Sequence, residues 1–255
     1  MKVFLPATLG AAIMAIASPA NADDDAFELW LNPSFGTQLD DNTGIEFETA
    51  QRFRSAGDGR SDSYFGRLWL LQDLTDDITL GGAIEQRIND GGSDETRVMQ
   101  QLSISHGLWK TRLRLEERFV DGTGRMGLRL RPRLGIELPL GADTPWSFEA
   151  DHELGLTLKS NRPGGDDGLT SMRTQIGFNR DLNDTLSLSV AYLRNEDFED
   201  DAPDVVGHAL AIGLEFAPQV AAITALAPSL TLCSKRDVIH RPPRAGLEFE
   251  RFKYA

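Results

Sequence analysis

The sequence has very little cysteine and no long apolar run after its first 22 residues. Its 255 residues contain one cysteine, Cys233, which excludes a framework of internal disulfides and any metal cluster built on cysteine ligands. Beyond residue 22, no segment approaches the roughly 20 consecutive apolar residues that a spanning helix requires. If the chain enters a membrane, we expect it to do so with β-strands.

Positive charge is also scarce. The 26 Lys and Arg residues are outnumbered by 39 Asp and Glu residues, which gives a formal net charge of -13. Nucleic acid carries the same sign, so the balance argues against a nucleic-acid partner. The glycine-rich segments have no helix after them, so no phosphate-binding loop is predicted. We expect no cofactor and no metal site.

The N-terminus has the pattern of a signal peptide. Lys2 precedes an apolar run over 3–17, and residues 18–22 (SPANA) supply small residues at the positions that a signal peptidase reads. A membrane anchor is the alternative, but the run is too short for a comfortable span. We therefore predict a cleaved signal peptide over 1–22 and a mature chain that begins at Asp23.

The clearest architectural signal lies between Lys110 and Leu138. Charged residues alternate with leucine in two arms, and the DGTG sequence at 121–124 separates the arms. A period of two on both sides of a glycine turn predicts a β-hairpin. The hairpin alone is compatible with a sandwich, a lipocalin-like barrel or a membrane barrel.

Eleven segments in all have strand character. Their lengths lie near the 9 to 11 residues that cross a bilayer at a tilt, whereas strands of soluble proteins average about 5 to 6. Short Asp- and Asn-containing turns alternate with longer polar connections, as in outer-membrane barrels. The segments are 26–36, 43–53, 63–72, 78–88, 96–108, 110–119, 125–138, 145–158, 170–182, 185–194 and 205–216.

These features predict an all-β fold: an antiparallel up-and-down transmembrane β-barrel of 10 to 12 strands over 23–216. An odd count of eleven conflicts with the even numbers of bacterial single-chain barrels. We expect that segment 26–36, which contains Pro33, is a short edge strand or a lumen segment, and that one crossing is miscounted. Ten and twelve strands both remain open at this point.

The inward faces of the hairpin and of the next segment form the candidate site. In a meandering sheet these rows are cross-strand neighbours, so we expect arginines to face carboxylates. Two interpretations apply: a structural network that fills a narrow lumen, or a constriction that selects solutes by charge. The nine residues are Arg112, Arg114, Arg118, Arg129, Arg131, Arg133, Glu149, Asp151 and Glu153.

Catalysis is the competing class, because some outer-membrane barrels are lipid hydrolases or acyltransferases. A His-x-Ser pair on one strand is the arrangement to look for, and none of the four histidines has it. His106, His152 and His208 fall on the lipid-facing parity, where we expect structural roles. The acidic segment 195–204 lacks the glycine of a calcium loop, so we expect a solvated loop rather than a cation site.

Two arginine-rich motifs resemble a known family. RLEERF at 114–119 and GLRLRPRL at 127–134 are similar to the hairpin of a proteobacterial family of small outer-membrane β-barrels, the domain of unknown function 2490. Trp30, the stretch Glu46 to Arg52 and the closing strand at 208–216 look like that family too. The resemblance implies an exported barrel over about 26–216 and no established activity, so no catalytic residue is carried over.

The tail at 217–255 departs from that resemblance, because the barrel pattern ends at Phe216. We interpret it as a disordered extension or a reading-frame artefact, with a further strand over 246–252 as the alternative. The sequence thus predicts an outer-membrane barrel with a structural or passive role, and a low-conductance channel as its functional form. Lipid, lipopolysaccharide and the barrel-assembly machinery are the expected partners. A lipid-modifying enzyme and a soluble periplasmic lipocalin-like binder are the alternatives.

Overall fold

The computed structural model describes residues 26–54, 62–142, 144–199 and 203–218. The predicted signal peptide lies outside the described residues, as does the predicted tail apart from Ala217 and Pro218. The described residues contain no helix that is long and apolar enough to cross a membrane.

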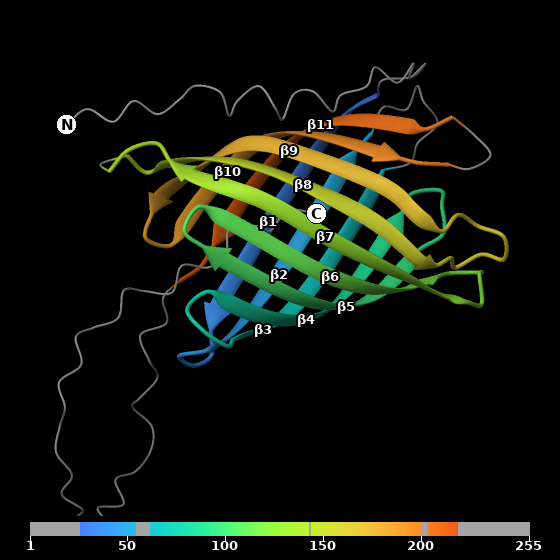
Figure 1. The fold of residues 1–255 in the computed structure, drawn as a ribbon, viewed down its shortest axis with the longest axis horizontal. Helices are drawn as coiled ribbons and strands as arrows, with labels where there is room; N and C mark the ends of the chain where they lie inside the picture. The colour runs from blue at the N-terminus through green and yellow to red at the C-terminus, as the bar shows by residue number, and fades with distance from the viewer. Residues whose placement is uncertain (1–25, 55–61, 143, 200–202, 219–255) are drawn as a thin grey trace, which may run out of the picture.

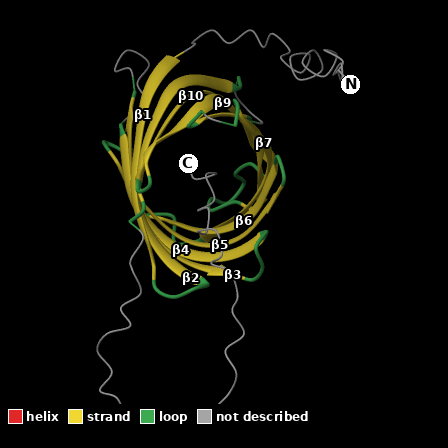
Figure 2. Ribbon diagram, turned by 90° about the vertical axis from the view of Figure 1, so that its left-hand side faces the viewer, coloured by secondary structure: helices red, strands yellow, loops and turns green. Residues whose placement is uncertain are grey.

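Eleven strands form one closed barrel (Figures 1 and 2). They are β1 (Ala26–Gln38), β2 (Thr43–Phe53), β3 (Ser63–Asp73), β4 (Ile78–Asn89), β5 (Glu95–His106), β6 (Trp109–Val120), β7 (Met126–Pro139), β8 (Trp146–Lys159), β9 (Gly168–Asn183), β10 (Leu186–Asp197) and β11 (Val205–Phe216). The predicted ends differ from these by at most three residues. The all-β barrel class and the count of 10 to 12 strands are therefore confirmed.

The barrel closes through a parallel pair. Consecutive strands are antiparallel throughout, and β1 pairs with β11 in parallel, with Ala26 opposite Gly207 and Phe35 opposite Phe216. An odd number of strands requires such a seam, because the first and last strands then run in the same direction. The suspected miscount is wrong.

The first segment is also a full strand rather than an edge strand or lumen segment. β1 has 13 residues and pairs with β2 on one side and β11 on the other. Pro33 lacks an N–H group, which removes one donor from the ladder without ending the strand. The pairing with β11 continues through Pro33, opposite Leu214.

The two rims of the barrel differ in the length of their connections. The short-turn rim carries the connections 39–42, 74–77, 107–108, 140–145 and 184–185, and the long-connection rim carries those after β2, β4, β6, β8 and β10. At 39–42 the backbone N–H groups of Asn42 and Thr43 donate to the Asp40 carboxylate at 2.9 and 2.8 Å. Both bonds lower the pKa of the Asp40 carboxyl group, and the bond from Asn42 has the larger effect. The Gly107 backbone has φ +61°, which a side chain would disfavour.

Polarity is inverted relative to a soluble protein. The most deeply buried side chains include Arg67, Glu85 and Glu116, which are 1%, 0% and 0% exposed, and all three point into the lumen. Outward residues such as Leu68 and Ile84 are large, apolar and more than half exposed. The period of two in each strand produces this division, because successive side chains point to opposite faces of the sheet.

The lumen has two unlike walls. The charged wall consists of β3 to β8 and carries most of the inward arginines and carboxylates. The small-residue wall consists of β10, β11 and β1, and none of its described inward side chains is Arg or Lys. Ala191, Ala209, Ala211, Leu193 and Trp30 form an apolar cluster on it.

Candidate functional site

The register of β6 and β7 places the hairpin arginines opposite one another. Arg112 pairs across the strands with Arg133, and Arg114 with Arg131. Like charges directly opposite each other are destabilising, so carboxylates are needed from neighbouring positions. They come from the same hairpin and from the strands on either side.

Glu153 on β8 pairs with arginines from three strands. It accepts hydrogen bonds from Arg112 and Arg131, and Arg173 lies 3.8 Å from it. Next to it, Arg133 donates to Asp151 at 2.7 Å. All of these side chains lie on the inward face, so part of the predicted network is present as arginine–carboxylate pairs.

Glu116 on β6 is the second centre of the network. It accepts from Arg129 at 2.7 Å and from Arg131 at 2.8 Å, and Arg97 lies 3.9 Å away. Arg131 therefore bridges the two centres. Arg118 does not join the β7 or β8 carboxylates and instead pairs with Glu95 at 2.5 Å.

The network extends further around the wall than the sequence prediction proposed. Arg97 on β5 lies 3.5 Å from Glu85 on β4, and Glu85 accepts from Arg67 on β3. Arg67 also reaches Glu48 on β2 at 2.7 Å. The same inward parity on segments 43–53, 63–72, 78–88 and 96–108 was the signal that would have identified these residues.

Two predicted members of the network have other partners. Arg114 donates to the Gln101 side chain at 2.9 and 2.7 Å, and no described carboxylate lies within ion-pair distance of it. Its guanidinium lies over the Trp69 ring, 5.0 Å from the centroid. Glu149 accepts a hydrogen bond from Asn179 at 2.8 Å instead of pairing with an arginine.

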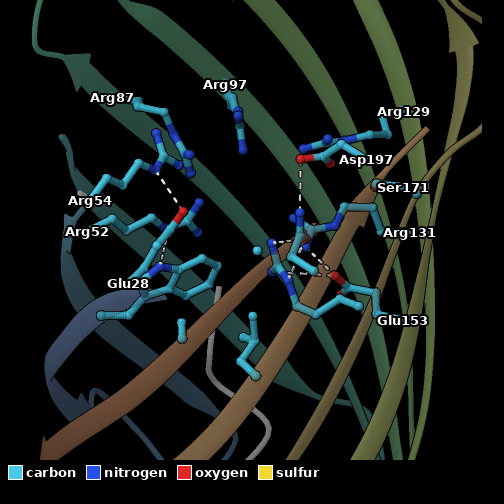
Figure 3. Close-up of a pocket in the computed structure, with 17 residues that line it drawn as sticks. Glu28, Arg52, Arg54, Arg87, Arg97, Arg129, Arg131, Glu153, Ser171 and Asp197 are labelled. Carbon is cyan, nitrogen blue, oxygen red and sulfur yellow. Dashed lines mark hydrogen bonds and ion pairs between the residues drawn. The ribbon is translucent and has the colours of Figure 1, made fainter. Parts of the chain in front are cut away.

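An internal chamber of about 200 Å³ lies beside this network (Figure 3). Arg52, Arg54 and Arg87 reach into it from one side, and Arg129 and Arg131 reach in from the other. The small-residue wall contributes the remaining apolar surface. The charged lining residues are Glu28, Arg52, Arg54, Arg87, Arg97, Arg129, Arg131, Glu153, Arg173 and Asp197.

Trp30 contacts two of these arginines. The Arg52 guanidinium carbon is 3.9 Å from the centre of the indole ring, and that of Arg173 is 5.1 Å away. The indole N–H donates to Glu28 at 2.6 Å, and Arg54 lies 3.3 Å from the same carboxylate. The turn at 39–42 fixes the register that sets Trp30 opposite Arg52, so this pair was within reach of sequence reasoning.

A wider vestibule of about 600 Å³ lies at the long-connection rim. It shares Arg54, Arg129, Ser171 and Asp197 with the chamber. Residues from the connections after β4, β8 and β10 also line it, including Ser93, Asn161 and Phe198. The chamber therefore lies below a polar entrance at this rim.

The three histidines in the described part of the chain lie away from the lumen. His152 contacts the Thr174 hydroxyl at 2.9 Å on the outward face, and His208 contacts the Tyr192 hydroxyl at 2.5 Å. His106 contacts Asp77 at 3.0 Å at the short-turn rim. The described residues contain no group of His, Cys, Asp or Glu that would hold a metal ion. Residues 200–202 of the acidic segment lie outside the described part.

A family model described as "Protein of unknown function (DUF2490)" matches residues 27–205. No curated protein matches the chain. The matched region runs from β1 to the first residue of β11, and it contains both arginine-rich motifs and every arginine of the charge network. The resemblance seen in the sequence is therefore confirmed, and the chain belongs to the DUF2490 family.

Proposed function

We propose that the protein is a transmembrane β-barrel of the bacterial outer membrane, exported by its signal peptide, with a charged and largely filled lumen. The observation that carries this proposal is the inverted polarity of the barrel. An arginine turned toward lipid at the midplane costs roughly 2 to 4 kcal/mol, so these arginines fix which face points inward. A soluble lipocalin-like barrel needs the opposite arrangement, with an apolar interior and a polar exterior.

Exposed aromatic residues near both rims support the membrane location. Outer-membrane barrels carry aromatic girdles at the two interfaces. Near the long-connection rim the exposed outward rings are Phe27, Phe53, Tyr64 and Phe119, and near the short-turn rim they are Phe35, Trp109, Trp146 and Phe216.

The separation of these rings fits a bilayer. Trp109 and Phe119 mark the two girdles on β6, ten positions apart. At about 3.3 Å per residue that is roughly 33 Å along the strand, or roughly 25 Å along the barrel axis at a tilt of about 40°. The apolar band of an outer-membrane barrel is about 25 Å tall.

Membrane insertion is testable with the mature chain that begins at Asp23. We expect it to require detergent, to float with liposomes after refolding, and to show heat-modifiable migration in SDS gels. A membrane barrel buries its exposed apolar surface in lipid, which explains all three results. A monomer that stays soluble without detergent would overturn the proposal.

The lumen favours a structural or passive role with low conductance. Ion pairs from Glu48 to Glu153 run along the wall, and charged rings of this kind restrict and select ions in pores. Arg131 binds both Glu116 and Glu153, so its side chain links these two carboxylates at the centre of the network.

Planar-bilayer recordings test the passive-channel role. We expect small single-channel currents from the wild type and larger ones from Arg131→Ala, because the truncation opens space between Glu116 and Glu153. Arg180→Ala is the matched control, since that arginine lies on the outward face over Trp146. Silence from the wild type and from Arg131→Ala would leave only a structural role.

A further inference from the structure

The chamber beside Trp30 has more positive charge at its surface than its own carboxylates balance. Each of its three carboxylates already has partners: Glu28 binds Trp30 and Arg54, Glu153 binds Arg112 and Arg131, and Asp197 accepts from Asn195 at 2.9 Å. Seven arginines share the cavity surface with them. Some of these arginines pair with Glu85, Glu95 and Glu116 behind the surface. Arg52 is the arginine of the chamber for which the described residues provide no ion pair.

Arg52 is buried and has no anionic partner among the described residues. It is 6% exposed, and its Nε has no hydrogen-bond partner. Its guanidinium lies over two aromatic rings, 3.9 Å from the centre of Trp30 and 5.5 Å from that of Phe65. A buried charge without an ionic partner carries a large desolvation cost, which an anion in the chamber would offset.

The arginines that line the chamber reach into it from opposite sides. Arg52 and Arg87 lie on β2 and β4, whereas Arg129 and Arg173 lie on β7 and β9. A carboxylate presents two oxygens in one plane, but a tetrahedral oxyanion presents oxygens in several directions and accepts from both sides at once. Guanidinium forks also match phosphate oxygens in pairs.

We propose that this chamber binds a small phosphate, as the free ion or a monoester, with Arg52 and Arg173 as its principal ligands beside Trp30. A volume of about 200 Å³ corresponds to roughly seven waters at ~30 Å³ each, which is enough for such an anion with part of its hydration. The vestibule at the long-connection rim gives access. The site is internal and does not depend on conduction or on a membrane.

Calorimetric titration of the full-length mature protein in detergent tests this site. The probes are inorganic phosphate and glycerol 3-phosphate, with succinate as a dicarboxylate of comparable charge. We expect saturable binding of at least one phosphate probe, and binding at least tenfold weaker for succinate. Equal affinity for succinate, or no saturable binding of either phosphate probe, would overturn the proposal.

Variants localise the binding. Arg52→Gln and Arg173→Gln are each expected to weaken phosphate binding at least tenfold, while Arg180→Gln on the outward face leaves it unchanged. Arg52→Lys keeps the charge and loses the paired donors, so we expect an intermediate affinity if Arg52→Gln fails to fold. Heat-modifiable migration reports folding independently. Unchanged affinity in folded Arg52 and Arg173 variants would overturn the assignment.

Discussion

The charged wall and the small-residue wall occupy the lumen in opposite ways. β3 to β8 fill space with long side chains that are held by ion pairs, as around Glu116 and Glu153. β10, β11 and β1 leave space with glycine, alanine and serine. Because a closed barrel has a fixed width, long side chains on one wall require short ones on the other.

This division shows that the lumen is filled from one side. Most ion pairs of the charged wall join neighbouring strands, so their effect is to fix register and side-chain position along that wall. The small-residue wall contributes van der Waals contact and allows the strands around it to approach closely. Beside Trp30, between the two walls, the filling is incomplete and the chamber remains.

The largest expected effect comes from removing a carboxylate from the charged wall. Glu116→Ala leaves Arg129 and Arg131 buried with one shared anion fewer, and breaking such a buried pair costs about 3 to 5 kcal/mol. The urea midpoint for loss of the heat-modifiable band measures this change. Glu117→Ala, one position along on the outward face, is the control and should shift the free energy of unfolding by under ~0.5 kcal/mol. Equal shifts would remove the distinction between the faces.

A side chain added on β9, where it meets β10 of the small-residue wall, should have an intermediate effect. A Cβ at Gly177 would lie 2.5 Å from the Ala191 Cβ and 2.6 Å from the Val190 carbonyl oxygen. Gly177→Ala therefore forces the strands apart, at a cost of about 1 to 3 kcal/mol. Gly82→Ala is the control, since nothing lies within 4 Å of its added methyl group. If both variants unfold at the wild-type urea concentration, the contact between β9 and β10 is not closely packed.

The smallest effect is expected for Arg114, which has no carboxylate partner among the described residues. Arg114→Met removes a buried charge that bonds only Gln101 and keeps a long side chain over Trp69. Replacing a buried charge by an apolar group of similar volume is often neutral or stabilising, so we expect a change of no more than about 1 kcal/mol or a gain. A loss comparable with that of Glu116→Ala would show that all arginines of this wall act as one unit.

Much of the fold followed from local periodicity. Each strand alternates small or charged residues with large apolar ones, which identified all eleven segments and their inward faces. The parallel seam did not follow, because periodicity describes single strands and hairpins and carries no information about how the first strand meets the last. Pro33 also misled the interpretation of β1, since a proline weakens a ladder without necessarily ending it.

The sequence predicted which residues belong to the charge network better than it predicted which arginine binds which carboxylate. Inward parity identified Arg112, Arg131 and Glu153 correctly as neighbours. It did not distinguish Arg114, whose position along the wall places it beside Gln101 and Trp69 rather than beside an acid. Which arginine reaches which carboxylate depends on barrel curvature and side-chain length, and the alternating residue pattern determines neither.

The parallel seam bears on how the chain reaches its final form. Every other pairing joins consecutive strands, whereas Ala26 and Gly207 are separated by nearly the whole barrel. Contacts between residues so distant in sequence are slow to form, so the meander is expected to assemble as an open sheet before it closes. Until then β1 and β11 are free edges, with unpaired N–H and C=O groups that pair readily with another chain. Any catalyst of this assembly must therefore hold apart, and then join, two edges that run in the same direction.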